Sequence, residues 1–100
     1  MDKQRLESSI RESIPLSRSM DFRIQALSDT AISVHGGHQE NINIHGTAFA
    51  GSLYCLCTLA VWGLVYSRLP KNAALVIAQG HIDYQKPVVG TITAKRTMTS

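Results

Sequence analysis

The longest apolar stretch of the chain lies between residues 46 and 67, which carry no charged side chain. A helix at a protein surface shows a polar face every three to four residues, and this stretch shows none. We therefore expect a continuous helix from Ala50 to Ser67 that is buried on most of its faces. Pro70 and Asn72 follow it and are typical of a helix exit.

The segment before this helix carries two other periodicities. Residues 2–13 place Leu6 and Ile10 at helical spacing among charged residues, which predicts a short amphipathic helix that Pro15 ends. Residues 20–27 alternate apolar and polar positions, with Phe22, Ile24 and Ala26 on one face. Residues 31–35 form the second strand of the predicted hairpin, after a polar turn at 28–30.

Two more strands are predicted after the long helix, over residues 75–84 and 91–99. A helix that is apolar on every side and has strands before and after it is best enclosed by a curved antiparallel sheet. We therefore expect an α+β fold in which such a sheet wraps the long central helix. A chain of 100 residues is one domain, here residues 1–100.

The same apolar run could be a membrane span, because about twenty uncharged residues suffice to cross a bilayer. Gly, Ala, Ser and Thr dominate its first third, however, and strand patterns follow it, so we favour enclosure by protein and no membrane partner. The charged N-terminus lacks the apolar core of a signal peptide, which predicts a cytoplasmic protein.

The net charge of +3 is mild and the basic residues are scattered, so no nucleic-acid partner is expected. Charged residues make up only 17% of the chain, which indicates surface covered by self-association. A homo-oligomer, either a dimer or a tetramer, is therefore predicted.

Cys55 and Cys57 point about 200° apart on a helix and cannot bridge within it. Small buried apolar side chains are the preferred interpretation, over zinc binding or redox chemistry. His35 and His38 would hold a metal only with a third ligand. No metal and no cofactor are predicted.

Two motifs carry a family resemblance. Residues 41–54 read N-x-N-x-H-G-T-A-F-A-G-S-L-Y, and residues 82–90 read I-x-Y-x-K-P-V-x-G. Together they resemble the hotdog-fold thioesterases, and most of all the YiiD-type thioesterase domain. The resemblance implies a curved sheet around a central helix, edge-to-edge dimers, and sites at the dimer interface that accept acyl groups carried by coenzyme A (CoA) or acyl carrier protein (ACP). It also implies strands beyond residue 100, so the hotdog domain is expected to be incomplete or its sheet completed by other means.

The family pattern, H-G-G followed by six intervening residues and then an acid, falls on Phe49, Ala50 and Gly51 and places Thr58 at the acid. The triplet that begins at His35 is not the match, because it precedes a polar loop instead of a helix. The usual general base of these relatives is therefore absent from the chain.

The resemblance implies that the Gly51 and Ser52 amides bind the thioester oxygen at the start of the helix, and that Asn43, His45 or Thr58 orients water. Two alternatives stay open: Gly51 could serve close packing, and His45 could cap the loop. The candidate substrate-binding residues are Thr47, Phe49, Tyr54 and Lys86, with the aromatic rings lining an acyl pocket and the lysine meeting the phosphates of the carrier.

The predicted function is hydrolysis of an acyl-CoA or acyl-ACP thioester at a dimer-interface site. The alternative is a non-catalytic hotdog module that binds acyl chains or holds a dimer together, which Thr58 and the early end of the chain favour. A dehydratase is weaker, because no acid lies on the helix. Asp83 of a partner subunit is a further candidate base, although a solvated strand position explains it equally.

Overall fold

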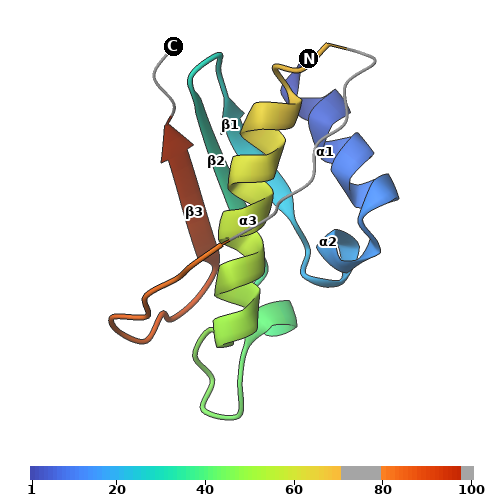
Figure 1. Ribbon diagram of the computed structural model, residues 1–100. Helices are drawn as coiled ribbons and strands as arrows, with labels where there is room; N and C mark the ends of the chain where they lie inside the picture. Colours follow the sequence, from blue (N-terminus) through green and yellow to red (C-terminus); the bar gives the residue numbers. More distant parts are fainter. Residues whose placement is uncertain (71–79, 98–100) are drawn as a thin grey trace.

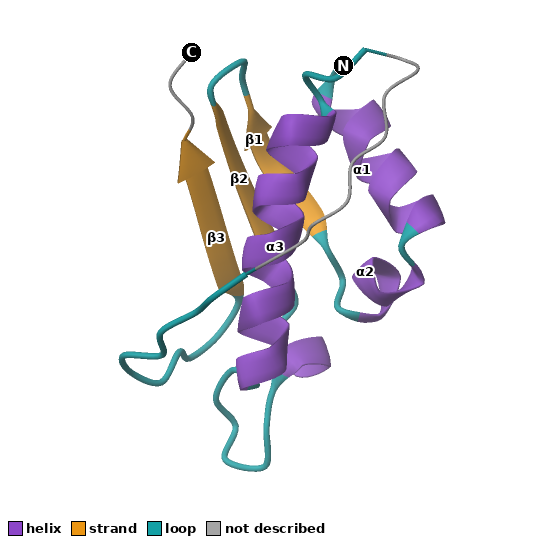
Figure 2. Ribbon diagram, in the orientation of Figure 1, coloured by secondary structure: helices purple, strands orange, loops and turns teal. Residues whose placement is uncertain are grey.

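The computed structural model describes residues 1–70 and 80–97. Its elements are the helices α1 (Lys3–Ser13), α2 (Pro15–Ser19) and α3 (Ala50–Tyr66), the strands β1 (Arg23–Leu27), β2 (Ala31–Gly36) and β3 (Ile92–Thr97), and a 3-10 turn at Gln39–Asn41. The strands form one antiparallel sheet in the order β1-β2-β3. Helix α3 lies across one face of this sheet, with α1 and α2 beside it (Figures 1 and 2).

The N-terminal helix agrees with its sequence pattern. Asp2 caps α1 by accepting a hydrogen bond from the Arg5 amide at 2.8 Å, and the spaced Leu6 and Ile10 side chains are fully buried. Pro15 follows the last turn of α1, as predicted, but it also begins α2, which the pattern did not predict. A proline at the first helical position has no amide to leave unpaired, so it starts a helix as readily as it ends one.

The first strand departs from strict alternation. It begins at Arg23 instead of Met20, because residues 20–22 form the turn that leaves α2. Its pairing with β2 shifts by one residue between Ile24 and Ala26. This bulge reverses the face of the sheet to which the following side chains point. The prediction that Ala26 faces inward is therefore wrong: Ala26 is exposed, and Leu27 packs against the core opposite Ile32.

The long helix lies where the charge-free run predicts it, and its buried residues are Leu56, Leu59, Ala60, Gly63 and Leu64. They pack on the inner face of the sheet, which is formed by Ile24, Ile32, Val34, Ile92 and Ala94. The expectation that most faces are buried is wrong for the described residues, since Cys57 and Val61 on the other side of α3 are exposed. A three-stranded sheet covers only one side of a helix. Within the described residues, no helix is long and apolar enough to cross a membrane.

The strand expected over residues 75–84 falls partly on residues 71–79, which lie outside the described part of the chain. Its described portion, 80–84, is irregular backbone and not a strand, so the prediction is wrong there. Instead of joining the sheet, segment 80–91 docks beside the start of α3. The Tyr84 hydroxyl donates to the Ala50 carbonyl at 2.7 Å, and the Ala48 amide donates to the Val88 carbonyl at 2.8 Å.

Candidate functional site

The loop that leads into α3 is held by the side chain of Asn43. Its Oδ1 accepts hydrogen bonds from the His45 and Thr47 amides at 2.9 and 3.2 Å, and its Nδ2 donates to the Thr47 hydroxyl at 2.9 Å. Gly46 adopts a φ of 78°, in the left-handed region that glycine occupies without strain. Asn43 and Thr47 therefore shape this turn, and the exposed His45 projects from its tip.

The first turn of α3 has no side-chain cap. Phe49 is the N-cap residue and contributes no side-chain hydrogen bond, and the first turn holds no acidic residue. The first helical hydrogen bond joins the Leu53 amide to the Phe49 carbonyl at 3.2 Å. Among the described residues, the amides of Ala50, Gly51 and Ser52 have no partner. The positive end of the helix dipole is thus open to an acceptor or an anion.

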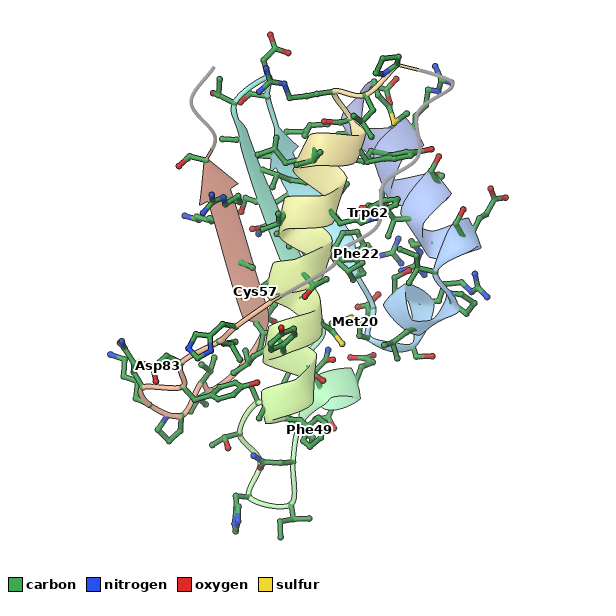
Figure 3. The ribbon with its side chains drawn as sticks, viewed as in Figure 1. Met20, Phe22, Phe49, Cys57, Trp62 and Asp83 are labelled. Atoms are coloured by element: carbon green, nitrogen blue, oxygen red, sulfur yellow. The ribbon has the colours of Figure 1, made fainter. Side chains whose placement is uncertain are left out.

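A cavity of about 220 Å³ opens beside this turn, between α2 and the first half of α3, and we call it the α2–α3 cavity. Its lining residues are Leu16, Ser19, Met20, Glu40, Asn41, Phe49, Gly51, Ser52 and Cys55. Figure 3 shows Met20 between the two helices and Phe49 at the entrance of α3. The Phe49 ring lies over Gly51, because a Cβ built on Gly51 would meet a ring carbon at 2.6 Å.

A second cavity of about 240 Å³ lies on the other side of α3, where Tyr54, Cys57, Thr58 and Val61 face residues 80–82. Five of the predicted site residues thus fall into two groups, whereas Asn43, His45, Thr47 and Lys86 line neither cavity. Gly51, Ser52 and Phe49 border the α2–α3 cavity, whereas Thr58 and Tyr54 border the second one. Thr58 follows Gly51 by seven residues, which is about 10 Å along a helix axis.

Although Cys57 is exposed, partial desolvation by the walls of this second cavity raises the pKa of its thiol. A raised pKa keeps the thiol protonated and weakens it as a nucleophile or a metal ligand. The prediction that both cysteines are small buried side chains is nevertheless wrong for Cys57, which is exposed, while Cys55 is half-buried. Lys86 and Asp83 are exposed on segment 80–91, and Figure 3 shows Asp83 on its outer side, away from α3.

Two histidines have buried nitrogen atoms without a partner, the Nδ1 atoms of His35 and His38. A metal site needs at least one more ligand beside them. Over residues 1–70 and 80–97, no group of three or more His, Cys, Asp or Glu side chains is placed to hold a metal.

Asn41 is a residue of the cavity that the sequence analysis missed. It is 2% exposed, and its Nδ2 donates to the Met20 and Gly37 carbonyls at 2.9 and 2.7 Å. Its Oδ1 is buried without a hydrogen-bond partner. Asn41 begins the N-x-N-x-H motif, but nothing in that pattern distinguishes the buried asparagine from Asn43, which holds the loop.

Comparison with known proteins places this geometry in a family context. Residues 3–100 match a family model described as "Putative thioesterase (yiiD_Cterm)". The crystal structure of a putative thioesterase from Shewanella oneidensis is 34% identical, with a TM-score of 0.86 over 93% of this chain and 71% of that chain.

Two other solved structures share the architecture. A Chlorobaculum tepidum protein of unknown function is 30% identical, with a TM-score of 0.89 over 98% of this chain and 62% of that one. A Pseudomonas aeruginosa protein described as a probable thioesterase is 16% identical, with a TM-score of 0.86 over 99% of this chain and 67% of that one, and this likeness concerns the fold alone. The chain thus spans between about three fifths and seven tenths of the length of these proteins.

Proposed function

The chain belongs to the YiiD C-terminal family of thioesterase-like proteins and has their hotdog fold, and from this premise we propose that it hydrolyses an acyl thioester in the α2–α3 cavity. The substrate class is an acyl group carried on CoA or on ACP. The observation that supports this proposal most directly is the uncapped first turn of α3, whose free amides border the cavity.

Thioester hydrolysis passes through a tetrahedral intermediate with a negatively charged oxygen. Backbone amides that are already in position stabilise that charge without reorganisation, and losing one such donor typically lowers the rate by a factor of about 10²–10³. The Gly51 and Ser52 amides supply two donors at the positive end of the α3 dipole. Because Gly51 has no side chain, the carbonyl group of a substrate can approach the Gly51 amide closely. This approach requires the exposed Phe49 ring to turn aside.

The remaining walls of the cavity suit an acyl chain. Leu16, Met20, Phe49 and Cys55 contribute apolar surface, and Leu16 and Phe49 are both 56% exposed at the mouth. We assign them to the acyl group, and Lys86, exposed on the neighbouring segment, to the carrier phosphates. The exposed strip of α3 that includes Val61 lies on the side of the second cavity, and it is the surface on which we place a second copy of the chain.

Three other candidate residues lie outside this arrangement. Asn43 uses both ends of its amide within the loop, His45 projects from the loop tip, and Thr58 borders the second cavity. They would act on the thioester only through loop movement or across a subunit interface. The variants His45→Ala and Thr58→Val test these roles by their effect on kcat.

A second candidate function is acyl binding without hydrolysis. It is favoured by the composition of α3, which carries no carboxylate along its 17 residues. A family member that lacks the usual acid could retain the cavity and the oxyanion donors and still bind thioesters.

Release of free thiol from a panel of acyl-CoA and acyl-ACP thioesters separates the two functions. We expect turnover that Gly51→Val lowers by on the order of a hundredfold, because its side chain blocks the approach to the amides. Gly63→Ala, on the same helix but against the sheet, is the matched control and should keep the rate. A folded protein that binds these thioesters and releases no thiol from any of them would overturn hydrolysis in favour of binding.

A further inference from the structure

Hydrolysis in the α2–α3 cavity needs a group that accepts a proton from water, and α3 offers no carboxylate. One carboxylate does line the cavity among the described residues, that of Glu40 in the 3-10 turn before the loop. Its side chain makes no hydrogen bond or ion pair to the part of the chain that the structure describes. Glu40 is therefore free to act on a molecule in the cavity.

The neighbouring Asn41 lines the same cavity, and its side chain is held in one orientation. Both hydrogens of its amide nitrogen are used, in the bonds to the Met20 and Gly37 carbonyls, so the orientation of the amide is determined. Its Oδ1 remains buried and unpartnered. The two donated bonds join the Gly37 turn to Met20 at the end of α2, so the Asn41 side chain fixes the position of that turn.

Gly37 brings the two groups together. Its carbonyl anchors Asn41, and a Cβ at Gly37 would overlap the Glu40 carboxylate, so that carboxylate lies directly over the glycine. The other carboxylate beside Gly37 is that of Asp21, which is paired with Arg23 at 3.3 Å. Of the two carboxylates at Gly37, only that of Glu40 is unpaired.

We propose that Glu40, which lies on the Gly37 turn that Asn41 fixes, deprotonates the water that attacks the thioester. This assignment rests on the proposed function. Glu40 removes one proton from the water as the water oxygen bonds to the carbonyl carbon, and the other proton stays on that oxygen. The resulting oxyanion lies at the Gly51 and Ser52 amides. When the carbon–sulfur bond breaks, the thiolate takes the proton from Glu40, and the products are a carboxylic acid and a free thiol.

Glu40 can be tested without disturbing the core, because its side chain is exposed. Glu40→Gln should lower kcat by at least about a hundredfold, which is typical for the loss of a positioned proton acceptor. Glu12→Gln, an exposed carboxylate on α1 outside this cavity, is the matched control and should keep the full rate.

A chemical rescue distinguishes proton transfer from a structural role. Added formate should restore turnover several-fold in Glu40→Ala, since a small carboxylate can occupy the vacated space, and should have no effect on Glu12→Ala. If Glu40→Gln keeps kcat within threefold of the parent, or if formate fails to rescue Glu40→Ala, the assignment of Glu40 is overturned while the parent enzyme remains a thioesterase. If the parent releases no thiol from any thioester, the proposed function fails and this inference falls with it.

Discussion

The assigned orientation of the Asn41 amide leads to a prediction about stability. In Asn41→Asp the donor group is replaced by a second oxygen, which then faces the Met20 and Gly37 carbonyl oxygens. Two buried hydrogen bonds of 2.9 and 2.7 Å are lost, and repulsion replaces them. At about 1 kcal/mol for each bond plus the penalty for unpaired buried groups, we expect the free energy of unfolding to fall by about 2–4 kcal/mol at neutral pH.

The loss should depend on pH, and its sign follows from the same geometry. Burial against two carbonyl oxygens disfavours a charged carboxylate, so the pKa of the introduced carboxyl group is higher in the folded than in the unfolded state. A raised folded pKa means that stability is present at low pH and is lost as the pH rises through that pKa. A protonated carboxyl group also donates one of the two missing bonds. The difference from the parent should therefore shrink towards acidic pH.

Urea unfolding followed by circular dichroism at pH 4.5 and pH 7.5 measures both effects. The matched control is Asn43→Asp, because Asn43 Oδ1 already accepts from two backbone amides and a carboxylate keeps those bonds. Asn43→Asp should cost about 1 kcal/mol, the contribution of its bond to the Thr47 hydroxyl and of its long bond of 3.4 Å to the Ala48 carbonyl. Equal destabilisation by the two substitutions, or no pH dependence for Asn41→Asp, would show that the Asn41 amide is not oriented as described.

Three further predictions concern single residues. Gly46→Ala should lower the free energy of unfolding by about 1–2 kcal/mol, because alanine is strained at a φ of 78°. No atom lies within 4 Å of the new Cβ, so the loss comes from the backbone alone, and an unchanged urea midpoint would contradict it. Gly63→Ala should leave the free energy of unfolding unchanged or raise it slightly, because the new Cβ meets Ile10 and Ile32 at an ordinary contact distance of 3.4 Å. Gly63→Leu should unfold at a markedly lower urea concentration, because the larger side chain overfills the same space. Cys57 should react with iodoacetamide at pH 8 more slowly than a free thiol, because partial desolvation raises the pKa of its thiol, and urea should remove the difference.

The elements that local pattern determines were predicted correctly. The amphipathic spacing of Leu6 and Ile10 defines α1, and the strand over residues 31–35 is confirmed as β2. The charge-free run defines α3 to within one residue at its end. In each case the periodicity lies within the segment itself, so no distant contact is needed to recognise it. The hotdog fold and the thioesterase family followed from the motifs at 41–54 and 82–90.

Where a partner segment decides the structure, the pattern was misleading. The bulge after Ile24 depends on how β1 pairs with β2, and it turns Ala26 outward despite perfect alternation. Residues 80–84 alternate like a strand, but their backbone runs beside the start of α3, where the Tyr84 hydroxyl meets the Ala50 carbonyl. Alternation states which residues could share a face and does not state which neighbour accepts the backbone hydrogen bonds.

The candidate site divides in the same way. The sequence by itself determined the start of α3, with Gly51 and Ser52 in its first turn, because helix entry is a local event. Only the tertiary structure decided that Asn41 is buried with a free oxygen and that Glu40 lies in the same cavity. Burial is set by what packs around a residue, here α2, the Gly37 turn and α3, which are far apart along the chain.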